Sequence, residues 1–118
     1  MDHIVKSAND RKFVEAAYGF YLSDEQNALD IAAYCWEHET ENLLLNHSNL
    51  PDEFFNLRTG LAGAVLQKFS NYRIRAAAVV DPGKISGRFS ELVRELNRGS
   101  FFRVFESRAE AESWLLGI

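Results

Sequence analysis

The sequence predicts a single α/β domain, spanning residues 1–118, in which a mixed five-stranded sheet packs against four helices. Two observations predict this fold class. Short apolar runs alternate with longer segments whose apolar residues recur at helical spacing, and turn or cap residues stand at the junctions. The 118 residues are 47% hydrophobic and 25% charged, which is typical of a globular domain with its own core.

The first two strands are predicted to form a hairpin. They cover residues 3–7 and 13–18. Between them lie Asn9 and Asp10, two residue types that tolerate the left-handed backbone of tight turns. The sheet therefore starts with an antiparallel pair.

A helix follows the hairpin. Ser23 and Gln26 have the spacing of a capping box, so we expect Ser23 to cap its first turn. Its apolar residues recur at helical spacing and predict one buried face. That face contains Ala28, Leu29, Ala32, Cys35 and Trp36.

Strands and helices then alternate to the end of the chain. The expected elements are a strand at 43–45, a loop at 46–56, a helix at 59–72, a strand at 73–81, a helix at 86–98, a strand at 101–105 and a final helix after Ser107. The uninterrupted apolar run Ala76–Val80 predicts a strand buried on both faces inside the sheet. The last helix is expected to bury Trp114. The order is β-β-α-β-α-β-α-β-α, which implies helices packed on a mixed sheet.

Three segments carry a family resemblance. They are residues 50–63, which read LPDEFFNLRTGLAG, residues 66–73 and residues 110–115. Together they resemble a small bacterial domain-of-unknown-function family, number four-one-eight-zero, over nearly the whole chain. That resemblance implies no activity.

A more distant resemblance, to the STAS superfamily of anti-sigma-factor antagonists, rests on the element order and on the stretch Thr59–Gly63. It implies a STAS-like fold and, in regulatory members, phosphorylation of the hydroxyl at this place by a partner kinase. The acidic residue usual two positions earlier is Leu57 here, and Arg58 intervenes. A kinase that reads the acidic residue would not read this site in the same way.

The start of the second helix is the candidate binding or switch site. Its residues are Arg58, Thr59, Gly60 and Gly63. Free N–H groups at a helix start attract anions, Arg58 adds positive charge, and the glycines leave the backbone accessible. The simpler alternative is that Thr59 only caps the helix.

The preceding loop, residues 50–58, is a candidate rim for an anionic or apolar ligand. It carries Asp52, Glu53, Phe54 and Phe55. The two carboxylates are adjacent, so they lack the separation of an acid/base pair. The alternative is a solvated turn whose two aromatic rings fold onto the core.

Several classes of function are disfavoured. A net charge of −4 argues against nucleic-acid binding. Cys35 is the only cysteine, which excludes an intrachain disulfide, and the three histidines lack metal-ligand spacing. We expect no metal and no cofactor. The run at 76–80 is too short to cross a membrane, and no signal segment opens the chain, so a cytoplasmic location is expected.

These observations favour a regulatory or protein-interaction module with a protein partner. The alternative is a small-molecule binding protein that uses loop 50–58 and the start of the second helix. An enzyme is disfavoured, since no catalytic constellation is evident. The pattern does not determine whether the chain forms a homodimer.

Overall fold

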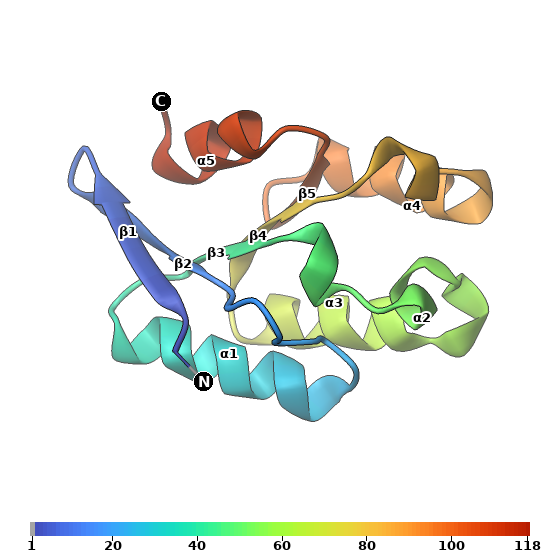
Figure 1. Ribbon diagram of the computed structural model, residues 1–118, viewed down its shortest axis with the longest axis horizontal. Helices are drawn as coiled ribbons and strands as arrows, with labels where there is room; N and C mark the ends of the chain where they lie inside the picture. Colours follow the sequence, from blue (N-terminus) through green and yellow to red (C-terminus); the bar gives the residue numbers. More distant parts are fainter. Residues whose placement is uncertain (1) are drawn as a thin grey trace.

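A computed structural model describes residues 2–118. Among these residues, five strands form one sheet in which spatial order equals sequence order (Figure 1). The strands are β1 (Ile4–Ala8), β2 (Arg11–Glu15), β3 (Asn42–Leu45), β4 (Arg75–Val79) and β5 (Phe102–Phe105). β1 is antiparallel to β2, and the other neighbours are parallel, so the predicted mixed sheet is confirmed.

Residues 2–118 contain five α-helices rather than the four predicted. They are α1 (Glu25–Glu37), α2 (Asp52–Phe55), α3 (Leu61–Asn71), α4 (Gly87–Arg98) and α5 (Arg108–Leu116). The additional helix, α2, lies in the segment predicted to be a loop. It has only four residues, which is too short for helical periodicity to show.

The predicted second helix starts two residues late, because residues 57–59 form a 3-10 turn. Gly60 then has a φ of 78° and leads the chain into α3. The left-handed region costs glycine little, so the abrupt change of direction falls on this residue.

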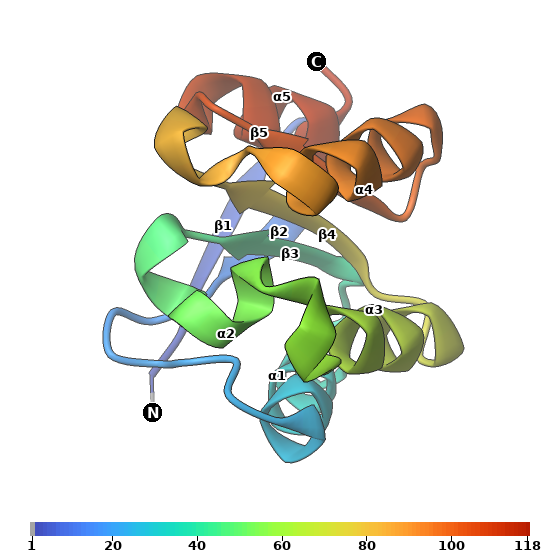
Figure 2. The same ribbon diagram turned by 90° about the vertical axis from the view of Figure 1, so that its right-hand side faces the viewer.

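The helices cover the two faces of the sheet unequally. In Figure 1 and Figure 2, α5 lies on one side of β2–β4, and α1, α2 and α3 lie on the other. α4 flanks β5, and its Phe89 and Val93 join the core on the side of α1 and α3. The smaller core under α5 is built around Phe13, Leu44 and Leu115.

Alternation along the central strands explains the two cores. Leu43 and Leu45 face α1 and α3, whereas Leu44 faces α5. In β4, Ala76 and Ala78 share the first face and Ala77 the second. All of these side chains are fully buried, and the run is flanked by β3 and β5, as predicted.

The hairpin turn agrees with the prediction. Asn9 and Asp10 have φ values of 54° and 61°, the left-handed pair that a two-residue hairpin loop requires. Every residue of β1 is exposed, and β1 forms one edge of the sheet.

Two details of α1 differ from the prediction. Its N-cap is Asp24, not Ser23, and a capping box joins Asp24 with Asn27 through contacts of 2.9 and 3.2 Å. Trp36 does not lie in the core, because 52% of it is exposed. The buried face is centred on Ile31 and Cys35, and Trp36 lies about 100° further round the helix.

Trp114 gives the first testable prediction. It is half-buried between Phe105, at 5.8 Å between ring centroids, and the guanidinium of Arg75, 3.8 Å from the ring. We expect Trp114→Ala to lower the free energy of unfolding by about 3 kcal/mol, measured by urea denaturation. Trp36→Ala is the matched control, with an expected change of about 0.5 kcal/mol. Equal effects would contradict the different placement of the two indoles.

Candidate functional site

Thr59, at the predicted site, uses its hydroxyl locally. Oγ1 lies 2.7 Å from the carbonyl oxygen of Glu53 and 2.9 Å from that of Asn56, and it accepts the N–H of Leu61 at 3.2 Å. These contacts close the turn before α3. They correspond to the simpler interpretation, in which Thr59 is a cap.

Arg58 and the two glycines remain accessible. The Arg58 side chain is exposed and forms no ion pair with any residue in the range 2–118. A Cβ built on Gly60 or Gly63 would meet no atom within 4 Å. The surface is open there, and anion or partner binding at this corner stays a prediction.

The candidate rim residues pack over the carboxyl ends of the parallel strands. Phe54 is buried against Phe89 and Phe102, at 6.2 and 6.5 Å between ring centroids. Phe55 stacks on His47 at 5.5 Å. Asp52 is exposed and 3.4 Å from Lys84, and Glu53 is also exposed. Both rings therefore fold onto the core, and this end of the sheet is covered.

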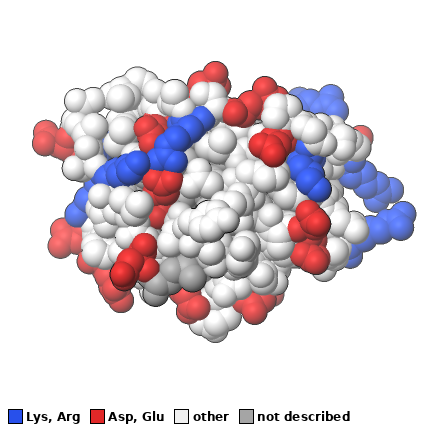
Figure 3. Space-filling model, in the orientation of Figure 1, with Lys and Arg blue, Asp and Glu red and all other residues white. Residues whose placement is uncertain are grey.

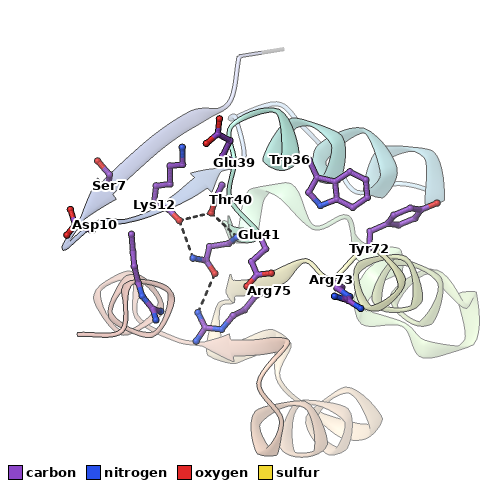
Figure 4. Close-up of a pocket in the computed structure, with 12 residues that line it drawn as sticks. Ser7, Asp10, Lys12, Trp36, Glu39, Thr40, Glu41, Tyr72, Arg73 and Arg75 are labelled. Atoms are coloured by element: carbon purple, nitrogen blue, oxygen red, sulfur yellow. Dashed lines mark hydrogen bonds between the residues drawn. The ribbon is translucent and has the colours of Figure 1, made fainter.

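The main cleft lies at the opposite end, where the parallel strands begin. It has a volume of about 1230 Å³ and is bounded by the β1–β2 hairpin, the turn between α1 and β3, and the turn between α3 and β4 (Figure 4). Its lining residues are Ser7, Asp10, Arg11, Lys12, Trp36, Glu39, Thr40, Glu41, Asn42, Tyr72, Arg73 and Arg75. We call it the amino-end cleft.

Hydrogen bonds fix the walls of the amino-end cleft to one another. The carbonyl oxygen of Lys12 accepts the hydroxyl of Thr40 at 2.7 Å and the amide of Asn42 at 3.1 Å (Figure 4). The hairpin is thereby joined to the α1–β3 turn. The amide N–H of Arg75 donates to the carbonyl of Glu41 at 2.7 Å, which joins that turn to β4.

Charge is concentrated in this cleft without being paired. Four basic and three acidic side chains line it, a net of one positive charge in a chain of net charge −4. Within residues 2–118, none of the seven takes part in an ion pair. They are Asp10, Arg11, Lys12, Glu39, Glu41, Arg73 and Arg75.

Two aromatic side chains stand at one end of the cleft. The rings of Trp36 and Tyr72 are 5.3 Å apart at an interplanar angle of 61°. They come from α1 and from the end of α3, two neighbouring helices. In Figure 4 the two rings lie side by side above Arg73.

Arg75 fixes the floor of the cleft to the end of α5. Its guanidinium donates to the carbonyl oxygens of Trp114 at 3.0 Å and Leu115 at 3.4 Å. Burial, together with the neighbouring Arg11 and Arg103, lowers the pKa of Arg75. The cation stabilises the negative end of the α5 dipole, so this arginine has a structural role.

A second depression, of about 330 Å³, continues the cleft toward β5. It shares Glu41, Arg73 and Arg75 with the first and reaches Phe101, which is exposed. The two together form a groove along the amino ends of the strands.

Among residues 2–118, no group of three His, Cys, Asp or Glu side chains could hold a metal ion. Burial raises the pKa of the Cys35 thiol to about 12, so it stays protonated at neutral pH. No helix within residues 2–118 has the length and apolar character needed to span a membrane.

Comparison with known proteins identifies the family. The model of the family Domain of unknown function (DUF4180) matches residues 8–115. The chain belongs to this family. No curated protein and no solved structure gives a significant match.

Sequence reasoning missed the amino-end cleft of this DUF4180 member. The sequence analysis places Arg73 and Arg75 in the strand predicted at 73–81 and Trp36 on the buried face of a helix, so none of the three is among the candidate site residues. The available signal was that charged pairs precede or open three parallel strands, at 11–12, 39–41 and 73–75. The amino ends of neighbouring parallel strands share one edge of a sheet, so such charges converge.

An ion pair between the buried Glu15 and the partly exposed Arg108 joins β2 to α5 in this DUF4180 domain. The Glu15 carboxylate accepts two hydrogen bonds from Arg108, at 2.5 and 2.6 Å, and one from Asn46 at 2.8 Å. Lys6 lies 3.2 Å away. Hydrogen bonds from Arg108 lower the pKa of Glu15 to about 2, even though burial opposes this shift.

The ion pair predicts a loss of stability in acid. Because folding lowers the pKa of Glu15 from 4.5 to about 2, its contribution is complete above pH 4.5 and is lost as the pH falls toward 2. The difference in unfolding free energy between wild type and Glu15→Gln should shrink over this range in urea titrations. Glu53→Gln, at an exposed carboxylate, is the control and should change stability little throughout. A Glu15→Gln difference independent of pH would exclude the ionised pair.

The Thr59 corner gives a separate prediction. Arg58→Ala should change the free energy of unfolding by no more than about 0.5 kcal/mol, because the side chain is exposed and unpaired. Thr59→Ala should cost about 1 kcal/mol through loss of the cap, whereas Thr59→Ser should retain it. Thermal denaturation of the three variants measures these differences. A large loss in Arg58→Ala would mean that the arginine supports the fold.

Proposed function

We propose that this domain is a non-catalytic, regulatory protein-interaction module, and that a segment of a partner protein binds in the amino-end cleft. The observation that carries the proposal is the set of seven charged side chains lining one cleft, none of them in an ion pair within residues 2–118. Arg75 is held by the carbonyl oxygens of Trp114 and Leu115, so the other six charges are the ones available to a partner of complementary charge.

The residue types of the cleft support a protein partner. Trp, Tyr and Arg dominate the binding energy of protein interfaces, because they combine large contact area with directional polar groups. The cleft presents Trp36, Tyr72 and Arg73 together at one end. Trp36 is 52% exposed, which leaves much of a large apolar ring free to be covered.

The dimensions also support a polymer rather than an enclosed small molecule. Pockets for small ligands have volumes of about 300–1,000 Å³, enclose most of the ligand and are mainly apolar. The amino-end cleft is larger, at about 1230 Å³, and is lined mostly by charged side chains. Its continuation past Arg75 to Phe101 suits an extended segment.

The alternative is a small-molecule binding protein that takes an anionic or apolar ligand at loop 50–58 and the start of α3. The exposed side chain of Arg58, which forms no ion pair within residues 2–118, favours an anionic ligand there. The local use of the Thr59 hydroxyl favours the cleft instead. The distribution of charge also disfavours nucleic acid as the partner, since Figure 3 shows acidic and basic side chains interspersed on the face in view.

A capture experiment with matched aromatic variants tests the proposal. The tagged wild-type domain, Trp36→Ala and Tyr21→Ala are used to retain proteins from cells that express the domain. Tyr21 is the control, because it is also 52% exposed but lies outside the cleft lining. We expect a protein retained by wild type and Tyr21→Ala to be lost with Trp36→Ala. A partner retained equally by all three, or lost only with Arg58→Ala, would exclude the amino-end cleft as its site.

A further inference from the structure

Two helices end at the amino-end cleft with the same backbone motif. After α1, the N–H of Glu39 donates to the carbonyl of Trp36 at 3.0 Å, and that of Thr40 to Cys35 at 3.1 Å. This pair of hydrogen bonds is a Schellman motif, which requires a left-handed residue just beyond the helix. That residue is Glu39, with a φ of 58°.

The end of α3 repeats the arrangement. The N–H of Arg73 donates to the carbonyl of Ser70 at 3.2 Å, and that of Ile74 to Phe69 at 2.8 Å. The left-handed residue is Arg73, with a φ of 56°. Both motifs therefore place a long charged side chain at a position where glycine is usual.

The other left-handed residues among those described follow the ordinary preferences. Gly60 and Gly117 adjoin helix ends, and Asn9 with Asp10 forms the hairpin turn. A Cβ group in the left-handed region crowds the backbone, a cost that glycine avoids and that asparagine and aspartate reduce. Among the described residues, Glu39 and Arg73 are thus the two that adopt the left-handed backbone without being glycine, asparagine or aspartate.

The side chains of Glu39 and Arg73 make no polar contact that would stabilise the fold of residues 2–118. Within residues 2–118, neither side chain makes a hydrogen bond or an ion pair, and both are exposed. Glu39 follows Trp36 by three residues and Arg73 follows Tyr72 directly. In Figure 4, Glu39 lies toward the hairpin and Arg73 lies below the two rings, so opposite charges flank the aromatic pair.

We infer that Glu39 and Arg73 determine the specificity of the amino-end cleft, and that its partner is a protein segment with an apolar or aromatic residue between a basic and an acidic side chain. The apolar residue contacts Trp36 and Tyr72. The basic group pairs with Glu39, and the acidic group pairs with Arg73. This inference rests on the proposed function, because it specifies the partner of the same cleft.

The first test measures stability without any ligand. The left-handed backbone at Glu39 and Arg73 is unfavourable for any residue with a Cβ, and glycine removes this cost. Glu39→Gly and Arg73→Gly should therefore each raise the folding equilibrium constant about two- to fivefold. Urea denaturation measures the change. Glu37→Gly is the control, since Glu37 is exposed in the last turn of α1, where glycine should lower that constant. Destabilisation by both glycine variants at 39 and 73 would overturn the inference.

The second test measures binding of short synthetic peptides with a central phenylalanine. The flanking residues are lysine and glutamate, two glutamates, two lysines or two serines. The NMR signal of the Trp36 indole N–H, assigned with Trp36→Phe, reports binding. The lysine–glutamate peptide should bind wild type most tightly, and each glycine variant should weaken it about two- to fivefold, the range of exposed ion pairs.

A change of charge completes the peptide test. Arg73→Glu should make the dilysine peptide the preferred one, because both flanking sites are then acidic. Equal binding of all four peptides, or an unchanged preference in Arg73→Glu, would overturn the inference, as would no response of the Trp36 signal to any peptide. The capture comparison of Trp36→Ala with Tyr21→Ala decides the proposed function independently, since it assumes nothing about the partner's sequence.

Discussion

The attachment of α5 is the constraint on which the rest of the structure depends. The central strands are apolar on both faces, and α5 is the one helix among residues 2–118 that covers the second face. A helix of nine residues is too short to be stable alone, so its position must come from tertiary contacts. Glu15 holds its first turn through Arg108, and Arg75 holds its last turn through two carbonyl oxygens. The second of these contacts also forms the floor of the amino-end cleft.

The two ends of the parallel strands differ in how far other parts of the chain cover them. Open α/β sheets usually bind ligands at the carboxyl ends of their strands. Here that end is covered by α2 and its neighbouring turns, through Phe54, Phe55 and contacts such as that of His47 with the N–H of Asp81 at 3.1 Å. Asn49 is fully buried and binds the carbonyl oxygens of Ala17 and Phe20. The amino ends, by contrast, are joined by turns that leave charged side chains in solvent.

Patterns that are local in the chain predicted the architecture well. The apolar run at Ala76–Val80 identified the buried strand, and Asn9–Asp10 identified the hairpin, because periodicity and turn preference act over few residues. The short helix α2 was not predicted for the same reason, since four residues are too few to show helical periodicity of apolar side chains. The cleft was not predicted because its residues are far apart in the chain and come together only in the folded structure. Trp36 and Arg73 lie on separate elements, and their convergence follows from the pairing of strands, which composition does not encode.

The different surroundings of the two tryptophans have a practical consequence. Trp36 is 52% exposed beside Tyr72, whereas Trp114, a residue of α5, is half-buried against Phe105 and the guanidinium of Arg75. Their fluorescence therefore monitors different events in one molecule. Emission from Trp114 reports the detachment of α5 from the sheet. Quenching of Trp36 by a collisional quencher in solution reports how accessible the groove is. Together the two indoles form an intrinsic pair of optical reporters, and occupancy of the groove can be distinguished from loosening of the fold without any label.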